Sequence, residues 1–256
     1  MTRIDASTFL VTGTSRGIGR AIARELVDRG GRVLAGRRDG TEDAVHGGSA
    51  VPVRMDLGSR ESIDACCDAL EDELGRIDVL INNAGSFTAG QLERQDVDEM
   101  YDLFQVNLVG LAHLTRKLLP SMLERGRGKI VNHASLVAYF HFPGISTYSA
   151  SKAGVSAFTE CLRRELKGTG VSTLEIVTGG VDTSMLRGAA DTLERNTDPS
   201  RWQWMKPDEW AARIVDAIEH DKQVLQPPGK SRLGKALSTA PAFVLDAVSA
   251  RGFSRG

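Results

Sequence analysis

The sequence has few cysteines and no excess of either charge, and both absences exclude classes of protein. Its 256 residues include three cysteines, two of them adjacent. Such an odd, adjacent set does not form a disulfide framework, so we expect reduced thiols and a cytoplasmic location. Lysine and arginine number 32 against 33 aspartates and glutamates, for a net charge of -1. We therefore expect no nucleic-acid partner, because binding one requires a basic surface.

Long apolar runs are also absent. No stretch approaches the roughly 18 apolar residues that cross a bilayer, and "TRIDASTFLVTG" lacks the apolar core of a signal peptide. No Cys/His cluster has metal-ligand spacing, so we predict no metal site. The composition, 41% hydrophobic and 25% charged, is that of a globular protein. We see no repeat or linker, and predict one domain over residues 1–256.

Short apolar runs alternate with amphipathic stretches along the chain. The runs predict strands at 8–13, 32–36, 50–57, 77–85, 128–135, 171–180 and 222–228. The amphipathic stretches predict helices at 17–30, 59–75, 96–124, 149–167 and 207–220. This alternation is typical of right-handed βαβ units and predicts an α/β fold with a mainly parallel seven-stranded sheet and helices on both faces. Ligands then bind at the carboxyl ends of the strands.

Between the first predicted strand and helix lies the glycine-rich turn "TGTSRGIG". Gly13, Gly17 and Gly19 would allow a tight turn, close approach of the backbone to a phosphate and close helix packing. The N–H groups at the helix start would face a pyrophosphate. A glycine-rich turn that binds nothing is the alternative, but the strand–turn–helix position favours a dinucleotide site. Further candidate contacts in the turn are Ser15, Arg16 and Ile18.

A second motif, "YSASK", places Tyr148 four residues before Lys152. A helix would put both side chains on one face. The nearby ammonium is expected to lower the pKa of the phenol from its usual value of about 10. The phenol could then deliver a proton to a carbonyl oxygen as a hydride reaches the carbonyl carbon. Alone, the motif could equally be the polar start of a helix.

The G-x-x-x-G-x-G turn, the "NNAG" segment at 82–85 and YSASK together resemble the short-chain dehydrogenase/reductase family, over roughly residues 8–228. The resemblance implies a Rossmann-type doubly wound fold and hydride transfer between a nicotinamide and a small-molecule carbonyl or secondary alcohol. It also implies a homodimer or homotetramer. A different class stays open beside it, a regulatory or interaction protein that binds NADPH without turnover.

The resemblance also implies roles for particular residues. Tyr148 would be the general acid/base and Lys152 the cation that lowers its pKa. Ser135 would hydrogen-bond the substrate oxygen, and Asn107 would distort its helix and support a water relay to the lysine. The implied cofactor contacts beyond the glycine turn are Asp56, Leu57, Asn83, Ala84, Gly85, Tyr148, Lys152, Gly179, Val181 and Thr183. For Asn83 the alternative is structural bonding between strand ends, and for Thr183 it is a helix cap.

Two positions bear on this pattern directly. Thr178 stands where the family usually has proline, and we expect the loss of that rigid residue to loosen the loop.

The second strand ends in Arg37 and Arg38, where NAD enzymes place an acid. A guanidinium suits a 2′-phosphate, so we predict NADP(H) in preference to NAD(H), with Arg16 in reach. Two solvated surface arginines are the alternative, and Asp39 could serve NAD.

The substrate side is less defined. Residues of about 184–206 are long enough for a lid, whose apolar members would favour an apolar substrate or pack on the core. Those members are Met185, Leu186, Trp202 and Trp204, and the predicted opposite wall holds Tyr139, Phe140 and Phe142, with His141 as a further lining candidate. We predict that His133 is a packing residue. The C-terminal extension, about 229–256, is expected to pack on a subunit or the core rather than on a membrane.

Overall fold

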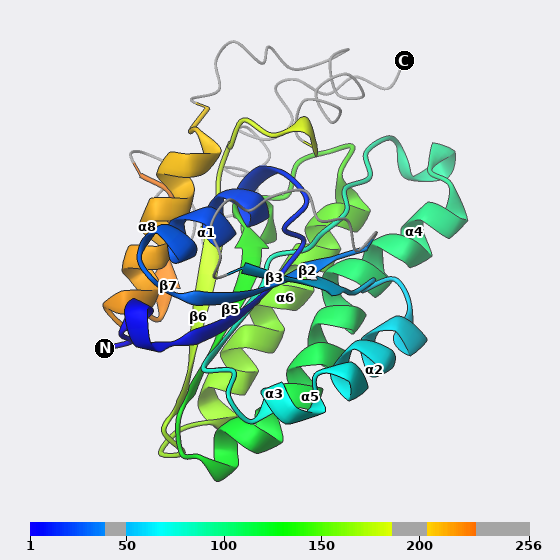
Figure 1. Cartoon of the computed structure of the whole chain (residues 1–256). Helices are drawn as coiled ribbons and strands as arrows, with labels where there is room; N and C mark the ends of the chain where they lie inside the picture. The colour runs from blue at the N-terminus through cyan, green and yellow to red at the C-terminus, as the bar shows by residue number, and fades with distance from the viewer. Residues whose placement is uncertain (39–49, 186–203, 229–256) are drawn as a thin grey trace.

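The computed structural model describes residues 1–38, 50–185 and 204–228 (Figure 1). The predictions for Asp39, Leu186, Trp202, most of the lid and the C-terminal extension therefore lie outside the described residues. Within the described part, no helix is long and apolar enough to cross a membrane. The same residues hold no group of three or more side chains that could bind a metal ion.

The described chain forms one sheet of seven parallel strands, in the order β3-β2-β1-β4-β5-β6-β7. The strands are β1 (Thr8–Thr12), β2 (Arg32–Arg37), β3 (Ala50–Arg54), β4 (Val79–Asn82), β5 (Gly128–Ser135), β6 (Val171–Thr178) and β7 (Val224–Leu225). All seven predicted strands are present, although β3, β4 and β7 are shorter than their apolar runs. The segments that follow them leave the sheet and become loops at its carboxyl edge.

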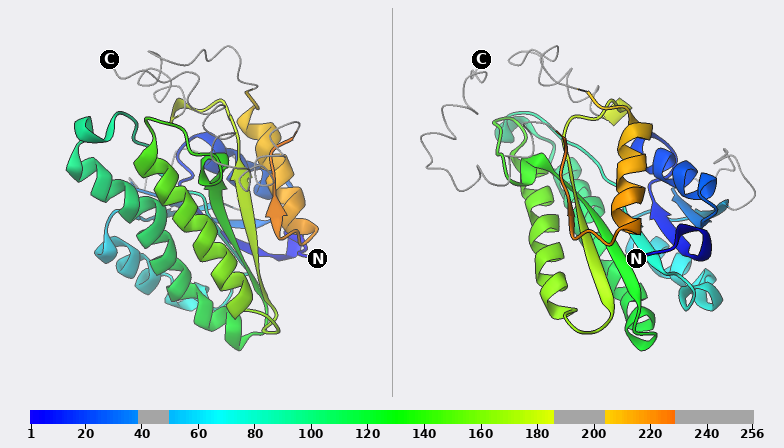
Figure 2. Two further views of the ribbon diagram at one scale, coloured as in Figure 1. Left: turned by 180° about the vertical axis from the view of Figure 1, so that it is seen from behind. Right: turned by 90° about the vertical axis from the view of Figure 1, so that its left-hand side faces the viewer.

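Helices cover both faces of the sheet (Figure 2). They are α1 (Gly17–Asp28), α2 (Arg60–Ala69), α3 (Glu71–Leu74), α4 (Val97–Phe104), α5 (Gly110–Glu124), α6 (Ser146–Glu165) and α8 (Pro207–Glu219). Short turns of 3-10 helix are η1 (Ile4–Ala6), η2 (Leu92–Arg94) and η4 (Leu136–Ala138).

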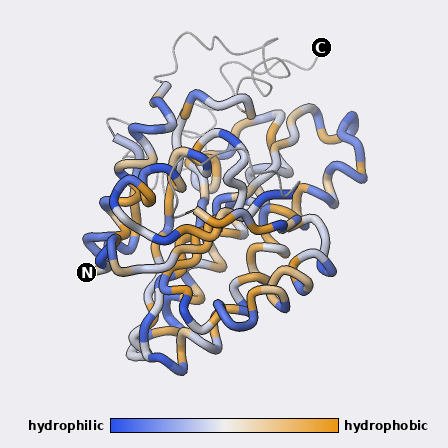
Figure 3. The backbone as a smooth tube through the Cα atoms, viewed as in Figure 1, coloured by the Kyte–Doolittle hydropathy of each residue, from blue (hydrophilic) through white to orange (hydrophobic). Residues whose placement is uncertain are grey.

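On each face of the sheet, an apolar core forms where the strands pack against the helices. Helices α1 and α8 pack together over one face, and α2, α5 and α6 share a core on the other. The most hydrophobic backbone segments run through the central strands, between these layers (Figure 3). The doubly wound Rossmann-type fold predicted from the sequence is confirmed, because the strands are parallel and helices pack on both faces of the sheet.

The predicted helix over 96–124 is interrupted. A π-helical segment, η3 (Gln105–Val109), separates α4 from α5. Asn107 lies in the middle of this segment, where the family resemblance implied a distortion. The helix predicted over 59–75 is likewise divided, at Leu70, into α2 and α3. A π-turn inside an α-helix is typical of functional positions, since it redirects side chains and backbone carbonyls.

Strand order determines where the motifs meet. The chain runs outward from β1 to β3 and then returns to β4, which pairs with the other side of β1. This reversal is the topological switch point where doubly wound folds bind ligands. The carboxyl ends of β1, β4, β5 and β6 are therefore contiguous, and they carry the glycine turn, NNAG, Ser135 and the loop after Thr178.

Candidate active site

The glycine turn and the NNAG segment are in direct contact. Gly13 has a φ of 71° and Gly17 one of 56°, both in the left-handed region that glycine tolerates. A Cβ atom on Gly13 would lie 2.8 Å from the Cα of Ala84, and one on Gly19 would lie 2.2 Å from the Gly13 carbonyl oxygen. Side chains are thus excluded from a backbone surface at the start of α1, where first-turn N–H groups lack intrahelical partners. That surface fits a pyrophosphate.

Asn83 ties β4 to the glycine turn. Its Nδ2 donates to the backbone oxygens of Thr12 (3.0 Å) and Gly13 (3.4 Å). In return, the Thr12 Oγ1 accepts the N–H groups of Asn83 at 3.0 Å and Ala84 at 2.9 Å. Asn82 is instead buried and donates to the side chains of Thr115 and Asn132, so it joins core elements. The Asn83 side chain therefore makes structural bonds between strand ends, as the alternative interpretation held. Its backbone lies beside the surface at the start of α1 that fits a pyrophosphate.

The three predicted cationic contacts differ in their surroundings. Arg37, at the end of β2, is only 4% exposed, and its Nε donates to the Thr14 Oγ1 at 3.3 Å. The alternative of a solvated surface residue is therefore wrong for Arg37. Arg38 is exposed. Arg16 donates from Nη1 to the Ser184 Oγ at 3.2 Å, which links the glycine turn to the segment after β6.

Asp56 and Leu57 lie beyond β3 rather than within it. The Asp56 N–H donates to the Ser62 Oγ (3.0 Å), and its Oδ1 accepts from the Gly58 N–H (2.9 Å). These bonds begin a turn into α2, which explains why the strand ends at Arg54. Leu57 is 4% exposed and packs in the core on the α2 face.

Tyr148, Lys152 and Ser135 come together at the carboxyl end of β5. Both the tyrosine and the lysine lie on α6, and the Lys152 Nζ is 5.9 Å from the centre of the Tyr148 ring. That Nζ donates to the backbone oxygen of His133 at 2.9 Å. The Ser135 side chain, at the end of β5, lies close enough to the Tyr148 hydroxyl to affect its pKa. The structure therefore brings the predicted acid, cation and oxygen-positioning hydroxyl into one cluster.

The acidity of this cluster differs from the prediction. Burial raises the pKa of Tyr148 to about 12, although its hydrogen bond to Ser135 acts in the opposite direction. Burial also lowers the pKa of Lys152 to about 8, because a desolvated ammonium is disfavoured. The expectation that Lys152 brings the tyrosine pKa below its usual value is therefore wrong in this structure. Loss of solvation is the largest cause of the shift in the Tyr148 pKa.

Asn107 holds the loop after β4 against α6. It is 1% exposed, and its Oδ1 accepts the Ser86 N–H at 2.8 Å. Its Nδ2 donates to the Ser86 backbone oxygen and to the Ser151 Oγ, both at 3.0 Å. With both amide hydrogens used, the side chain positions this loop against α6. Gly85 lies between them: a Cβ there would be 3.2 Å from the Asn107 Oδ1 and 3.6 Å from the Lys152 Nζ.

The loop after β6 reaches the glycine turn. Val181 is 3% exposed and pairs with Met205, and the Asp182 N–H donates to the Met205 oxygen at 3.0 Å. Thr183 lies beside Gly17, its Cγ2 being 3.4 Å from the position of a Gly17 Cβ. A Cβ on Gly179, at the start of the loop, would lie 3.3 Å from the Cβ of Pro227.

The prediction that Thr178 loosens this loop stays a prediction, although the threonine itself is held by buried bonds. Its Oγ1 is hydrogen-bonded to the His133 Nε2 and accepts the Trp210 Nε1–H at 2.9 Å, so the base of the loop is held by buried bonds. His133 is consequently a hydrogen-bonded residue, not only a packing one. The sequence signal that could have located this bond was the coincidence of two anomalies, a polar threonine and a histidine, on adjacent predicted strands.

One aromatic side chain, Phe87, packs against Tyr148. The Phe87 ring meets the Tyr148 ring edge-on, with centroids 4.7 Å apart, a contact that sequence reasoning missed. Phe140 and Phe142 stack at 6.4 Å, and Phe142 is 40% exposed. Tyr139 differs from the prediction, since its hydroxyl donates to the Glu175 Oε1 at 2.6 Å, toward β6.

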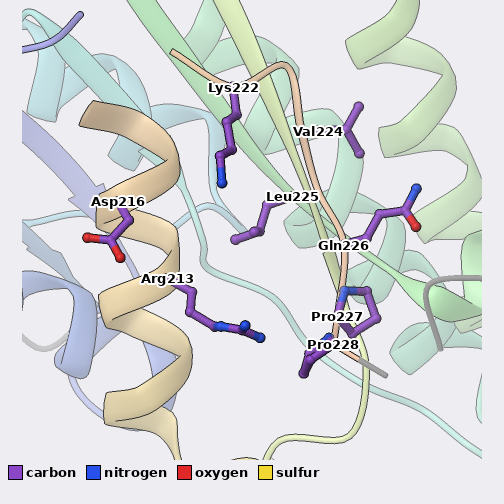
Figure 4. Close-up of a pocket in the computed structure, with 8 residues that line it drawn as sticks. All are labelled: Arg213, Asp216, Lys222, Val224, Leu225, Gln226, Pro227 and Pro228. Carbon is purple, nitrogen blue, oxygen red and sulfur yellow. The ribbon is translucent and has the colours of Figure 1, made fainter. Parts of the chain in front are cut away.

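A separate cavity of about 680 Å³ lies between α8 and β7 (Figure 4). It is lined by Arg213, Asp216, Lys222, Val224, Leu225, Gln226, Pro227 and Pro228. None of the predicted site residues lines this cavity. The candidate site is therefore defined by the strand ends and their loops.

Comparisons with known proteins agree with this geometry. Residues 7–194 match the sequence profile described as short chain dehydrogenase. The chain is 40% identical over 227 residues to the ketoacyl reductase HetN of Nostoc sp., covering 86% of this chain and 78% of that protein. It is 33% identical over 192 residues to the 3-oxoacyl-[acyl-carrier-protein] reductase FabG of Vibrio cholerae, covering 73% and 79%.

Solved structures give the same result. A short chain dehydrogenase from Burkholderia cenocepacia in complex with NADP superposes with a TM-score of 0.82 at 27% identity, over 96% of this chain and 98% of that one. A short-chain dehydrogenase from Streptomyces avermitilis superposes with a TM-score of 0.78 at 32% identity, over 96% and 94%. The profile match, the relatives and the shared fold together show that this chain belongs to the short-chain dehydrogenase family of oxidoreductases.

Proposed function

We propose that the protein is an NADP(H)-dependent oxidoreductase that interconverts a carbonyl group and a secondary alcohol on an apolar small molecule. The observation that carries the proposal is the cluster of half-buried Tyr148 and Ser135 with buried Lys152, beside a backbone surface that fits a dinucleotide. Ala84 contacts Gly13 on that surface, and Gly85 lies against the Lys152 ammonium. A nicotinamide that extends from the glycine turn would thus reach the tyrosine.

Each residue of the cluster has a distinct part in carbonyl reduction. When bound, the cofactor supplies the hydride. Tyr148 donates its proton to the carbonyl oxygen, and the Ser135 hydroxyl hydrogen-bonds the same oxygen as negative charge develops. A tyrosine pKa of about 12 keeps the phenol protonated at neutral pH, which is the form that reduction requires. Lys152 would stabilise the phenolate that remains, which offsets part of the cost that burial adds to proton transfer.

Three observations support the finer assignments. Arg37 ends β2 as a buried guanidinium, suited to a 2′-phosphate, and the Burkholderia cenocepacia relative was solved with NADP. The relatives HetN and FabG are named as reductases of ketoacyl or oxoacyl groups, which are carbonyl substrates. Phe87 presents aromatic surface beside Tyr148, which favours an apolar substrate.

The direct test is the absorbance of NADPH in the presence of aldehydes, ketones, quinones and 3-oxoacyl thioesters. We expect oxidation of NADPH with at least one apolar carbonyl compound, and slower turnover with NADH. Tight NADPH binding without turnover on the whole panel would overturn the proposal. It would instead support the regulatory alternative, a protein that binds NADPH and does not react.

Arg37→Asp should shift the cofactor preference toward NADH. The substitution removes the guanidinium at the end of β2 and adds an acceptor for a ribose hydroxyl, so we expect the NADPH/NADH ratio of kcat/KM to fall by about tenfold or more. Arg54→Asp is the matched control, because Arg54 pairs with Arg37 in the sheet and is exposed. A ratio that is unchanged in Arg37→Asp, or that falls equally in both variants, would remove Arg37 from this role.

Carbonyl reduction should weaken above a pH of about 8. The charged form of Lys152 assists the reaction, and its pKa of about 8 means that the charge is present below this pH and lost above it. Tyr148, with a pKa of about 12, stays protonated throughout. We expect kcat/KM for NADPH, which reports the free enzyme, to show a falling limb near this pH. Lys152→Arg should flatten that limb, because a guanidinium keeps its charge; a profile flat to pH ~10 in the wild type contradicts the assignment.

A further inference from the structure

A chain of buried hydrogen bonds crosses the ends of three strands beneath the candidate site. The Trp210 Nε1 on α8 is 2.9 Å from the Thr178 Oγ1 on β6, which is bonded to the His133 Nε2 on β5. The His133 Nδ1 is 3.0 Å from the Asn83 Oδ1 after β4. The Asn83 amide then binds the backbone oxygens of Thr12 and Gly13. The chain therefore connects helix α8 to the glycine turn.

The donor and acceptor of each bond in this hydrogen-bond chain can be assigned. The Asn83 Nδ2 faces two carbonyl oxygens and must donate, so its Oδ1 faces His133 as an acceptor. His133 consequently carries its proton on Nδ1, and its Nε2 accepts the Thr178 hydroxyl proton. An indole N–H can only donate, so Trp210 donates to the Thr178 Oγ1. All donors thus point one way, from α8 toward the glycine turn.

The middle of this hydrogen-bond chain is buried in the protein. Trp210 is 1% exposed, His133 7% and Thr178 9%, so water cannot replace a broken bond without penalty. Charge on the His133 ring would face the Lys152 ammonium, whose Nζ binds the His133 backbone oxygen. The hydrogen-bond partners of the ring are the neutral side chains of Asn83 and Thr178. The ring is thereby held neutral and in one tautomer.

Thr178 is the residue that this arrangement requires. Its hydroxyl accepts from Trp210 and donates to His133 at the same time, which an apolar or proline side chain cannot do. This accounts for threonine where the family pattern has proline. Asn83, at the far end, touches the turn closely: a Cβ on Gly19 would lie 2.3 Å from its Nδ2. The orientation of this amide therefore sets the spacing between the NNAG segment and the glycine turn.

We propose that His133 and Thr178 are positioning residues, which orient the Asn83 amide and through it hold the glycine turn in the geometry that binds NADPH. The inference rests on the proposed function, because it concerns the same cofactor. Neither residue touches the reacting atoms in this scheme. Their effect should appear in the affinity for NADPH rather than in the chemical step.

The test is a fluorescence titration of NADPH against wild type, Thr178→Val and Thr178→Ser. Valine keeps the shape of threonine but leaves the His133 Nε2 and the Trp210 N–H unpaired, so we expect the Kd for NADPH to rise about tenfold. Serine keeps the hydroxyl and should bind within about twofold of wild type. Saturating NADPH should restore most of the kcat in Thr178→Val, since the catalytic cluster is intact.

Thr173→Val is the matched control. Thr173 lies on the same strand and is 2% exposed, but its Oγ1 has no hydrogen-bond partner among the described residues. The same change there should leave NADPH affinity unaltered. Equal affinities in Thr178→Val and wild type would overturn the inference alone. Equal losses in both valine variants would also overturn it, because they would reflect general disturbance of β6. Absence of NADPH binding by wild type would overturn the proposed function, and the inference with it.

A second measurement is made on the wild-type protein and so does not depend on folding of Thr178→Val. Nitrogen-15 NMR of the histidine rings should show one neutral ring with the proton on Nδ1 at pH 7, assigned to His133 through loss of its signal in His133→Phe. Addition of NADPH should shift this signal, because Asn83 links the ring to the turn. An Nε2–H tautomer, a charged ring or a signal unaffected by NADPH would overturn the inference.

Discussion

Tyr148→Phe is expected to lower kcat for carbonyl reduction about a thousandfold while leaving the Kd for NADPH within about threefold of wild type. A general acid contributes roughly two to four orders of magnitude, and phenylalanine removes only the hydroxyl that supplies the proton. The ring remains, so the edge contact with Phe87 is kept and the site stays filled. Steady-state kinetics with saturating NADPH, combined with a fluorescence titration, would separate the two effects.

The tyrosine variant has a direct control in Tyr101→Phe. Tyr101 lies on α4 and is 75% exposed, so loss of its hydroxyl should change neither kcat nor cofactor affinity. If Tyr148→Phe retains more than about a tenth of the wild-type kcat, another group delivers the proton. If it instead loses NADPH affinity to the same extent as kcat, the hydroxyl serves binding rather than chemistry.

Gly19→Ala is expected to weaken NADPH binding about a hundredfold. The new Cβ would lie 2.2 Å from the Gly13 oxygen and 2.3 Å from the Asn83 Nδ2, distances at which the backbone or the amide must move. Forcing atoms into a packed site costs about 1–3 kcal/mol, and 1.4 kcal/mol corresponds to a tenfold change in affinity. The displacement falls on the turn that would face the pyrophosphate, so we expect NADPH affinity to fall more than the stability of the fold.

Titration calorimetry with NADPH measures this loss, and thermal unfolding without cofactor shows how much of the cost falls on the fold. Gly75→Ala is the matched control. Gly75 has a negative φ and follows α3, and a Cβ there meets nothing within 4 Å. We expect wild-type NADPH affinity in that variant. Wild-type affinity in Gly19→Ala as well would show that the turn does not contact the cofactor closely.

Some features of the site followed from local sequence. The glycine turn, the NNAG segment and YSASK each stand at the junction of one strand and one helix, and such junctions are marked by short-range patterns of glycines and apolar residues. Parallel strands align their carboxyl ends at one edge, so motifs at several strand ends were predicted to meet. Asn107 and Ser135 were instead predicted from the family resemblance, by their positions relative to Tyr148.

By itself, the sequence determined the fold class and the placement of the tyrosine–lysine pair on one face of α6. It also determined that the candidate site would lie at the carboxyl edge of the sheet. Only the tertiary structure decided that burial raises the Tyr148 pKa to about 12 and that Thr178 and His133 share a hydrogen bond. The physical reason is that periodicity reports which residues are buried, whereas solvation and hydrogen bonding depend on neighbours that are distant in the chain. Thr178 and His133 are 45 residues apart, and only the pairing of β5 with β6 brings their side chains together.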